Sequence, residues 1–219
     1  PERLAARSAL AIAESLNAVV RTYTRVEAID TRAHTLRIGE ERLDYGELVL
    51  ATGAAPIAPF DVPEALAGRV MTVNDLDDYR AFHAAVSDLG RPARVAIVGA
   101  GLVGCEFAND LLAGGHRVSL VAPEATPLPR LLPEPPGRAL AEAFRDAGMG
   151  LHLGAGVVGL QAEGGDALVC LEDGTSGVAD LVLLATGLRP RTALAEAAGL
   201  VVSAAGIHTD RTLATSAPD

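Results

Sequence analysis

Residues 94–104 read Arg94-Val95-Ala96-Ile97-Val98-Gly99-Ala100-Gly101-Leu102-Val103-Gly104. The apolar run at the start of this stretch predicts a strand, and the glycine-rich turn after it opens a helix that extends to Gly114. A second strand is predicted at residues 117–121. Consecutive parallel strands need a crossover helix, so this βαβ pattern predicts an α/β fold with a parallel sheet.

The three glycines of the turn fit the dinucleotide-binding fingerprint. Gly99 is expected to make the tight turn, Gly101 to let the backbone approach a pyrophosphate, and Gly104 to let helix and strand pack closely. The free N–H groups at the start of the helix would complete an anion site. We therefore predict a Rossmann-like three-layer dinucleotide-binding domain, with Leu102 and Val103 also at the nucleotide.

The end of the second strand bears on the choice between NAD and NADP. An acidic residue is expected there to hold the ribose 2′-hydroxyl, but this chain has Ala122, with Glu124 two residues later. A glutamate disfavours a 2′-phosphate, and no pair of arginines follows the strand, which favours NAD. Arg130 is the cation near this point; it either reaches the cofactor or is a solvated loop residue.

Two further residues of the predicted helix have alternative interpretations. Glu106, placed on the first helical turn, either stabilises the helix N-terminus or points toward the nicotinamide. Cys105 is expected to be a small packing residue and not a nucleophile, because no partner cysteine or histidine stands near it. The five histidines form no metal-binding pattern, so no metal is predicted.

An internal repeat extends the prediction to the rest of the chain. The segment Val49-Leu50-Ala51-Thr52-Gly53 recurs as Leu183-Leu184-Ala185-Thr186-Gly187, 134 residues later. In each copy a set of short strands precedes the segment and a proline follows it. We interpret this as a duplicated unit. The glycine turn begins 88 residues before Gly187, and the same distance counted back from Gly53 falls before Pro1, so the first copy is expected to lack its front half.

The amino-terminal third is predicted to hold one helix and several strands. The helix is expected within residues 2–16, strands at 19–30 and 48–51, and a turn at 31–34. The 48–51 run is apolar throughout, which is typical of a strand buried on both faces. Residues 54–69 contain three prolines, which predicts a linker between domains.

Composition excludes several classes of function. The 219 residues carry a formal net charge of −10, and all 18 basic residues are arginine, so a nucleic-acid partner is not expected. No apolar run is long enough to cross a bilayer, and no secretory signal is recognisable, so no membrane association is expected. Two widely separated cysteines suit the reducing cytoplasm.

These motifs resemble those of the FAD-dependent pyridine nucleotide-disulfide oxidoreductase superfamily, over nearly the whole chain from about Leu16. The most similar group is the rubredoxin-NAD(+) reductases. The resemblance is carried most specifically by the string from Gly101 to Leu111, and also by residues 74–79 and 187–192. It implies that FAD and NAD are the cofactors, and that electrons pass from NADH through FAD to rubredoxin or a similar small electron-transfer protein.

The resemblance also assigns roles to positions and domains. Residues 66–192 would be the NAD-binding domain. Residues 1–65 would be the carboxyl-terminal part of a homologous FAD domain, present as a β-meander remnant, together with a linker. Residues 193–219 would be a segment that returns into the FAD domain. Glu106 would lie near the nicotinamide end. The far side of NADH would be lined by Ala185, Thr186 and Gly187, and FAD would be approached by Val26, Thr52 and Gly53.

Departures from the family pattern leave alternatives open. Ala55 stands where relatives often carry an arginine that contacts FAD. The first glycine turn of the family would precede Pro1, and a Gly-Asp motif would follow Asp219, so residues 1–219 alone are expected to be inactive and to hold little FAD. The alternative functions are a related flavin enzyme, namely an NADH oxidase, a ferredoxin reductase, the flavin part of a nitrite reductase or a disulfide reductase, or an isolated NAD-binding module without turnover.

Overall fold

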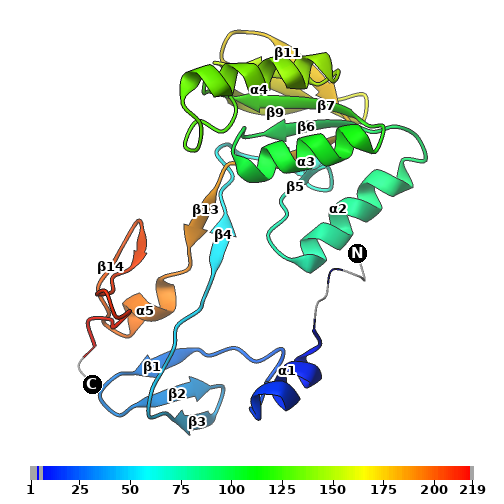
Figure 1. The fold of residues 1–219 in the computed structure, drawn as a ribbon. Coiled ribbons are helices and arrows are strands. Elements are labelled where there is room, and N and C mark those ends of the chain that lie inside the picture. Colours follow the sequence, from blue (N-terminus) through cyan, green and yellow to red (C-terminus); the bar gives the residue numbers. More distant parts are fainter. Residues whose placement is uncertain (1–3, 5–6, 218–219) are drawn as a thin grey trace. The chain divides into compact units, whose positions relative to one another are not determined.

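The chain folds into two compact units, one formed by residues 56–187 and the other by residues 2–55 together with residues 188–219. The structure is a computed structural model, and it describes Leu4 and residues 7–217. Figure 1 shows the course of the chain through both units.

The larger unit is built on a five-stranded parallel sheet with strand order β5-β12-β6-β7-β8. The βαβ unit predicted around the glycine turn is at its centre, so the predicted parallel sheet is confirmed. The bounds of the strands are Val70–Met71 for β5, Arg94–Val98 for β6, Arg117–Ala122 for β7, Gly150–Leu153 for β8 and Leu181–Leu184 for β12.

Both faces of this sheet are buried, because alternate residues of each central strand contribute to different cores. In β6, Val95 and Ile97 belong to the core on the helical face, whereas Ala96 and Val98 belong to the core on the opposite face. This division explains why the strands are apolar at nearly every position. It gives three layers: helices, parallel sheet and a β-meander (Figure 1).

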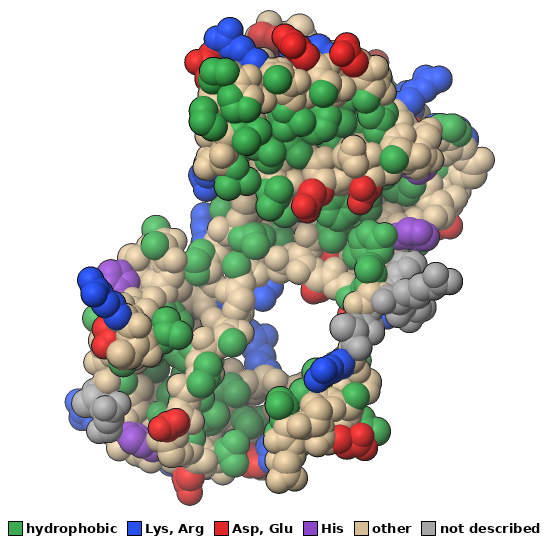
Figure 2. Space-filling view, in the orientation of Figure 1, with side chains coloured by type: hydrophobic (Ala, Val, Ile, Leu, Met, Phe, Trp, Pro, Cys, Tyr) green, Lys and Arg blue, Asp and Glu red, His purple; other side chains and the backbone are tan. Residues whose placement is uncertain are grey.

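The helical layer consists of α2 (Leu76–Asp88), α3 (Leu102–Ala113) and α4 (Glu134–Asp146). Asp75 caps the amino terminus of α2, because its carboxylate accepts the N–H groups of Asp77 and Asp78 at 3.0 and 2.9 Å. Figure 2 shows hydrophobic side chains gathered on the surface over α3 and α4. Leu102 and Val103, at the start of α3, are more than half exposed.

The meander layer is the antiparallel sheet β11-β10-β9, formed by β9 (Val157–Glu163), β10 (Asp166–Leu171) and β11 (Ser176–Ala179). Gly164, Gly165 and Gly174 have positive φ angles in the two tight turns. Each turn joins two antiparallel strands and so closes a β-hairpin.

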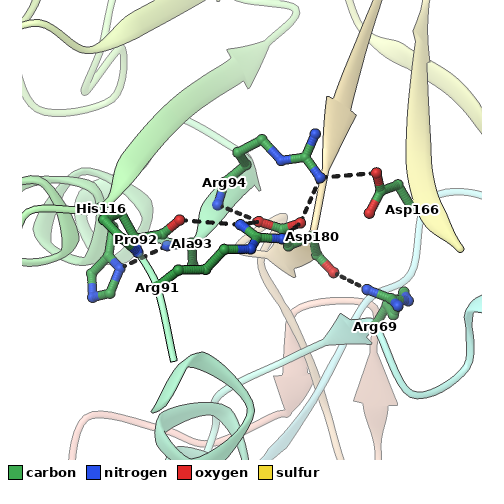
Figure 3. A network of polar contacts seen from close by, with 8 residues as sticks. All are labelled: Arg69, Arg91, Pro92, Ala93, Arg94, His116, Asp166 and Asp180. Atoms are coloured by element: carbon green, nitrogen blue, oxygen red, sulfur yellow. Dashed lines mark hydrogen bonds and ion pairs between the residues drawn. The ribbon is translucent and has the colours of Figure 1, made fainter. Parts of the chain in front are cut away.

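An ion-pair network joins the amino ends of β6 and β12 (Figure 3). The carboxylate of Asp180 is inaccessible to solvent and accepts hydrogen bonds from Arg91 at 2.8 and 2.9 Å, and from the backbone N–H and guanidinium of Arg94 at 2.7 and 2.6 Å. Arg94 also pairs with Asp166 of β10 at 2.9 Å, and Arg69 donates to the carbonyl of Asp180 at 3.0 Å. The network thereby links the central sheet to the meander.

This network changes the acidity of its buried carboxyl group. The hydrogen bonds from Arg91 and, after them, those from Arg94 hold the pKa of Asp180 well below its usual range, against the opposing effect of burial. A buried carboxylate is costly unless it is paired and hydrogen-bonded, and Asp180 meets both conditions.

The smaller unit contains α1 (Ala9–Leu16), α5 (Ala193–Ala197) and three small antiparallel sheets. Their strand orders are β1-β2-β3, β13-β4 and β14-β15. The strands are β1 (Ala28–Asp30), β2 (Thr35–Ile38), β3 (Glu41–Asp44), β4 (Ala54–Pro56), β13 (Leu188–Pro190), β14 (Val202–Ser203) and β15 (Gly206–Ile207).

The amino-terminal predictions were only partly correct. The predicted turn at residues 31–34 is present, and the predicted helix covers residues 9–16. Residues 2–3 and 5–6 of its predicted range lie outside the described residues. The strand predicted at residues 19–30 is limited to β1. The buried strand predicted at residues 48–51 is wrong, because this segment is irregular and Val49 is 87% exposed. A strand exists only where another strand pairs with it, and in the described part of the chain none pairs with residues 48–51.

The boundaries between the units also differ from those expected. The divisions lie after residues 55 and 187, whereas the sequence placed them after residues 65 and 192. The proline-rich segment is not a free linker, because Phe60, Val62 and the buried Leu66 pack into the meander-side core of the larger unit. After Gly187 the chain forms β13, which pairs with β4. Within the described residues, no helix is long and apolar enough to span a bilayer.

Candidate nucleotide-binding site

The glycine turn lies at the carboxyl end of β6, where Gly99 leaves the strand with a φ of 112°. Its N–H donates to the carbonyl of Val121 in β7 at 2.8 Å, which ties the turn to the neighbouring strand. A Cβ on Gly99 would lie 2.4 Å from the carbonyl oxygen of Ala185. No side chain fits there, so the tight turn predicted at Gly99 is confirmed.

The other two glycines differ in the space around them. A Cβ on Gly104 would lie 2.0 Å from the carbonyl oxygen of Gly99, so α3 packs directly on the turn, as predicted. Gly101 is the N-cap of α3. Apart from its direct chain neighbours, no described residue has an atom within 4 Å of the position that a Cβ on Gly101 would occupy. The backbone at Gly101 is therefore open to a ligand, beside helix N–H groups that have no partner within the helix.

A cavity of about 660 Å³ opens over this turn. Its walls come from the carboxyl ends of β6, β7 and β12, which is where open α/β sheets bind ligands. The predicted NAD residues that line it are Gly99, Gly101, Leu102, Glu124, Arg130, Ala185, Thr186 and Gly187. The structure thus brings together residues that are up to 88 positions apart in the sequence.

Val103, Gly104 and Glu106 were predicted at the nucleotide but do not line this cavity. Gly104 is buried behind the turn, and Val103 is 51% exposed on α3. The sequence predicted Glu106 on the first turn of the helix. In the structure it is the fifth residue of α3 and lies just past that turn. The interaction with the helix N-terminus weakens beyond that turn, which argues against the dipole-stabilising role for Glu106.

Several residues of the cavity wall were not predicted from the sequence. Those that come from distant segments of the chain are Pro59, Gly156, Val157 and Glu172. Pro59 belongs to the segment taken as a linker. Gly156 and Val157 follow β8, and Glu172 follows β10 in the hairpin that leads to β11. Their approach to the turn depends on the packing of the meander on the sheet, which leaves no local sequence signal.

The loop after β7 covers one side of the cavity. Leu128 has a φ of 54° and donates its N–H to the carbonyl of Ala100 at 2.8 Å, which fixes the loop to the glycine turn. Glu124 and Arg130, on either side of Leu128, have exposed side chains. The cavity wall therefore carries two carboxylates, Glu124 and Glu172, and one guanidinium, Arg130.

Cys105 contributes to packing beside this site. Its side chain is 6% exposed, and burial raises the pKa of its thiol, which keeps it protonated and unreactive at neutral pH. The packing role predicted for Cys105 is consistent with this environment.

The two Ala-Thr-Gly repeats make equivalent contacts, each within its own unit. The Thr52 hydroxyl donates to the carbonyl of Arg191 at 2.7 Å, and the Arg191 N–H donates to the carbonyl of Gly53 at 3.0 Å. In the other unit, the Thr186 hydroxyl donates to the carbonyl of Ile57 at 2.6 Å, and the Ile57 N–H donates to the carbonyl of Gly187 at 3.1 Å.

In each case the partner stands four residues after the glycine of the other repeat. Gly53 and Gly187 both have positive φ angles, of 68° and 104°. Chance similarity does not produce the same paired contacts twice, so this geometry supports the predicted duplication.

The predicted FAD residues lie in the smaller unit. Val26 and Thr52 line one hollow of about 990 Å³, whereas Gly53 does not line it. A Cβ on Gly53 would lie 3.4 Å from the guanidinium of Arg191, so the backbone there is closely approached. The smaller unit therefore has an open hollow at Val26 and Thr52, and Gly53 adopts a backbone conformation that favours glycine.

Comparison with known protein families decides which family has this arrangement. The family model described as pyridine nucleotide-disulphide oxidoreductase matches residues 2–219. The chain belongs to the pyridine nucleotide-disulphide oxidoreductase family. Members of this family use FAD and NAD(H), in agreement with the resemblance found in the sequence motifs.

Individual relatives within the pyridine nucleotide-disulphide oxidoreductase family are reductases. The chain is 44% identical over 207 residues to a rubredoxin-NAD(+) reductase of Alcanivorax borkumensis, a match that covers 94% of this chain and 53% of the relative. It is 39% identical to a nitric oxide reductase FlRd-NAD(+) reductase of Aeromonas salmonicida, with 88% and 48% covered. The chain therefore spans about half the length of the curated relatives it matches.

Solved structures of the family show the same fold. A ferredoxin reductase of Rhodopseudomonas palustris superposes with a TM-score of 0.86 at 30% identity, over 97% of this chain and 52% of the other. The α/β fold with a Rossmann-like domain is thus shared with an experimentally determined reductase.

Proposed function

We propose that this chain is part of an FAD-containing, NADH-dependent oxidoreductase that passes electrons from NADH through FAD to rubredoxin or a similar small electron-transfer protein. The observation that carries the proposal is the 660 Å³ cavity over the glycine turn, where Gly101 leaves the backbone open. The similarity to rubredoxin-NAD(+) reductase over 94% of the chain supports the choice of acceptor.

In this proposal the larger unit holds NADH. The turn at Gly99 and Gly101 would receive the pyrophosphate through backbone N–H groups, with Arg130 as a nearby positive charge. Leu102, Val103 and Gly104 would support this position, and Glu106 would lie toward the nicotinamide end. Ala185, Thr186 and Gly187 would line the far side of the dinucleotide.

The smaller unit would contribute to the FAD site through Val26, Thr52 and Gly53. The flavin, when bound, supplies the ability to take a hydride and release single electrons, while the protein binds and orients the reactants. The proposed compartment is the cytoplasm, where Cys105 and Cys170, both free thiols, would stay reduced.

The full-length protein tests this function directly. We expect it to purify with bound flavin, to lose its visible flavin absorbance when NADH is added without oxygen, and to reduce rubredoxin with NADH as donor. Absence of flavin absorbance in the natively purified protein would contradict the proposal. Flavin reduction without electron transfer to rubredoxin would retain the NADH and FAD sites and exclude the proposed acceptor.

The preference for NAD over NADP is expected to depend on Glu124. Replacing Glu124 with glutamine removes one negative charge from the cavity wall, so the ratio of the NADP⁺ to the NAD⁺ dissociation constant should fall by roughly threefold to tenfold. Calorimetric titration of the oxidised flavoprotein with each nucleotide measures the ratio without turnover. Glu142→Gln, an exposed α4 carboxylate that does not line the cavity, is the matched control. Equal ratios in both variants would contradict the role of Glu124.

A further inference from the structure

Glu172 connects the meander to the nucleotide cavity. It follows β10 directly, and its carboxylate accepts the N–H of Gly156 at 2.9 Å. Its own backbone N–H donates to the carbonyl of Gly156 at 2.9 Å. These two bonds fix residue 172 against the loop that follows β8, although the two residues are 16 positions apart.

Gly156 permits this close contact because it has no side chain. A Cβ there would lie 3.2 Å from the carboxyl carbon and from both carboxylate oxygens of Glu172. Most Cβ atoms are not approached so closely by atoms that are not bonded to them. The carboxylate therefore lies flat against the loop backbone, and it remains exposed where both residues line the cavity.

The same loop is bonded to the end of β7. The N–H of Gly154 donates to the carbonyl oxygens of Ala122 and Glu124, each at 3.0 Å. Glu172 is thus connected to the backbone of Glu124 through one short loop and two sets of hydrogen bonds. The end of the second strand is where a Rossmann-like fold receives the adenosine ribose, the part of the dinucleotide that distinguishes NADP from NAD.

We propose that Glu172 is a specificity-determining residue, which places a second negative charge beside that of Glu124 at the adenosine end of the cavity and so disfavours the 2′-phosphate of NADPH. This inference rests on the proposed NADH site. It explains how the chain can reject a 2′-phosphate although Ala122 occupies the position where an acidic residue was expected.

The charge of Glu172 and its hydrogen bond can be separated experimentally. Glu172→Gln removes the charge and retains an oxygen that can accept the Gly156 N–H. In the oxidised full-length flavoprotein, we expect this substitution to lower the ratio of the NADP⁺ to the NAD⁺ dissociation constant by roughly threefold to tenfold, as measured by calorimetric titration. The difference between wild type and variant should shrink at high salt, because ions screen exposed charges.

Asp173→Asn is the matched control, since it removes the same charge from the next residue of the same hairpin. The Asp173 carboxylate accepts bonds from the backbone and hydroxyl of Thr175 at 2.9 and 2.6 Å and does not line the cavity. We expect the control to leave the nucleotide ratio unchanged. An equal ratio in Glu172→Gln, Asp173→Asn and wild type, with NAD⁺ still bound, would overturn the inference alone. Failure of the wild-type protein to bind NAD⁺ would instead overturn the proposed NADH site.

Discussion

Replacement of Asp180 with alanine is expected to lower the free energy of unfolding by about 3–5 kcal/mol, the loss typical of breaking a buried ion pair from one side. The carboxylate accepts from Arg91 and Arg94, and its removal leaves these two guanidinium groups near each other without the shared anion. Urea unfolding of the full-length protein at neutral pH, followed by circular dichroism, measures the change.

Asp166→Asn provides the comparison within the same network. The Asp166 side chain is 32% exposed, and within the described residues its ion-pair partner is Arg94 alone. We expect its substitution to cost about 1 kcal/mol or less, as for partly solvated pairs. If Asp180→Ala cost no more than Asp166→Asn, the buried carboxylate would not be the centre of the network.

The same carboxylate predicts a pH dependence. The pKa of Asp180 is lower in the folded chain than the value of about 3.9 expected after unfolding. Its contribution to stability is therefore complete above about pH 4 and is lost as the pH falls toward the folded pKa. Unfolding measured between pH 5 and pH 2 should show a smaller decline for Asp180→Asn than for wild type.

Replacement of Gly104 with alanine is expected to weaken nucleotide binding by about a hundredfold or more. The new Cβ would lie 2.0 Å from the carbonyl oxygen of Gly99 and 3.3 Å from the Cβ of Ala185, and a Cβ is fixed to the backbone and cannot rotate away from the clash. The glycine turn must shift, and loss of two charge-assisted hydrogen bonds, each worth about 1.5–3 kcal/mol, accounts for a change of this size. Calorimetric titration of the oxidised flavoprotein with NAD⁺ measures it.

Gly101→Ala separates binding from folding. Its Cβ would meet open space, so we expect the free energy of unfolding to change by no more than about 1 kcal/mol, the cost of alanine at an N-cap. Nucleotide affinity should still fall, because the methyl group would occupy the space proposed for the pyrophosphate. Gly68→Ala, also in open space but away from the cavity, should change neither quantity. Unchanged NAD⁺ affinity in Gly101→Ala would contradict the proposed position of the pyrophosphate.

Features that depend on neighbouring residues could be predicted from the amino-acid sequence alone. The strand, turn and helix around Gly99 and Gly104 were predicted from the pattern of apolar residues and from the spacing of the glycines. The structure contains all three elements, with no room for a Cβ at either glycine. The cap of α2 at Asp75 is equally local. The repeated Ala-Thr-Gly segments identified a duplication because each copy carries its own turn residues.

Contacts between residues far apart in the chain could not be predicted in this way and are seen only in the folded structure. Leu48–Leu50 and Leu181–Leu184 have similar apolar sequences, yet only the second is a strand, because pairing with β5 and β6 satisfies its backbone. Asp180 is the centre of an ion-pair network, and Glu172 lies in the same cavity wall as Glu124, because the meander packs on the sheet. A hydrogen bond between residues far apart in the chain depends on how whole layers pack. Local sequence patterns do not specify which distant residues this packing brings into contact.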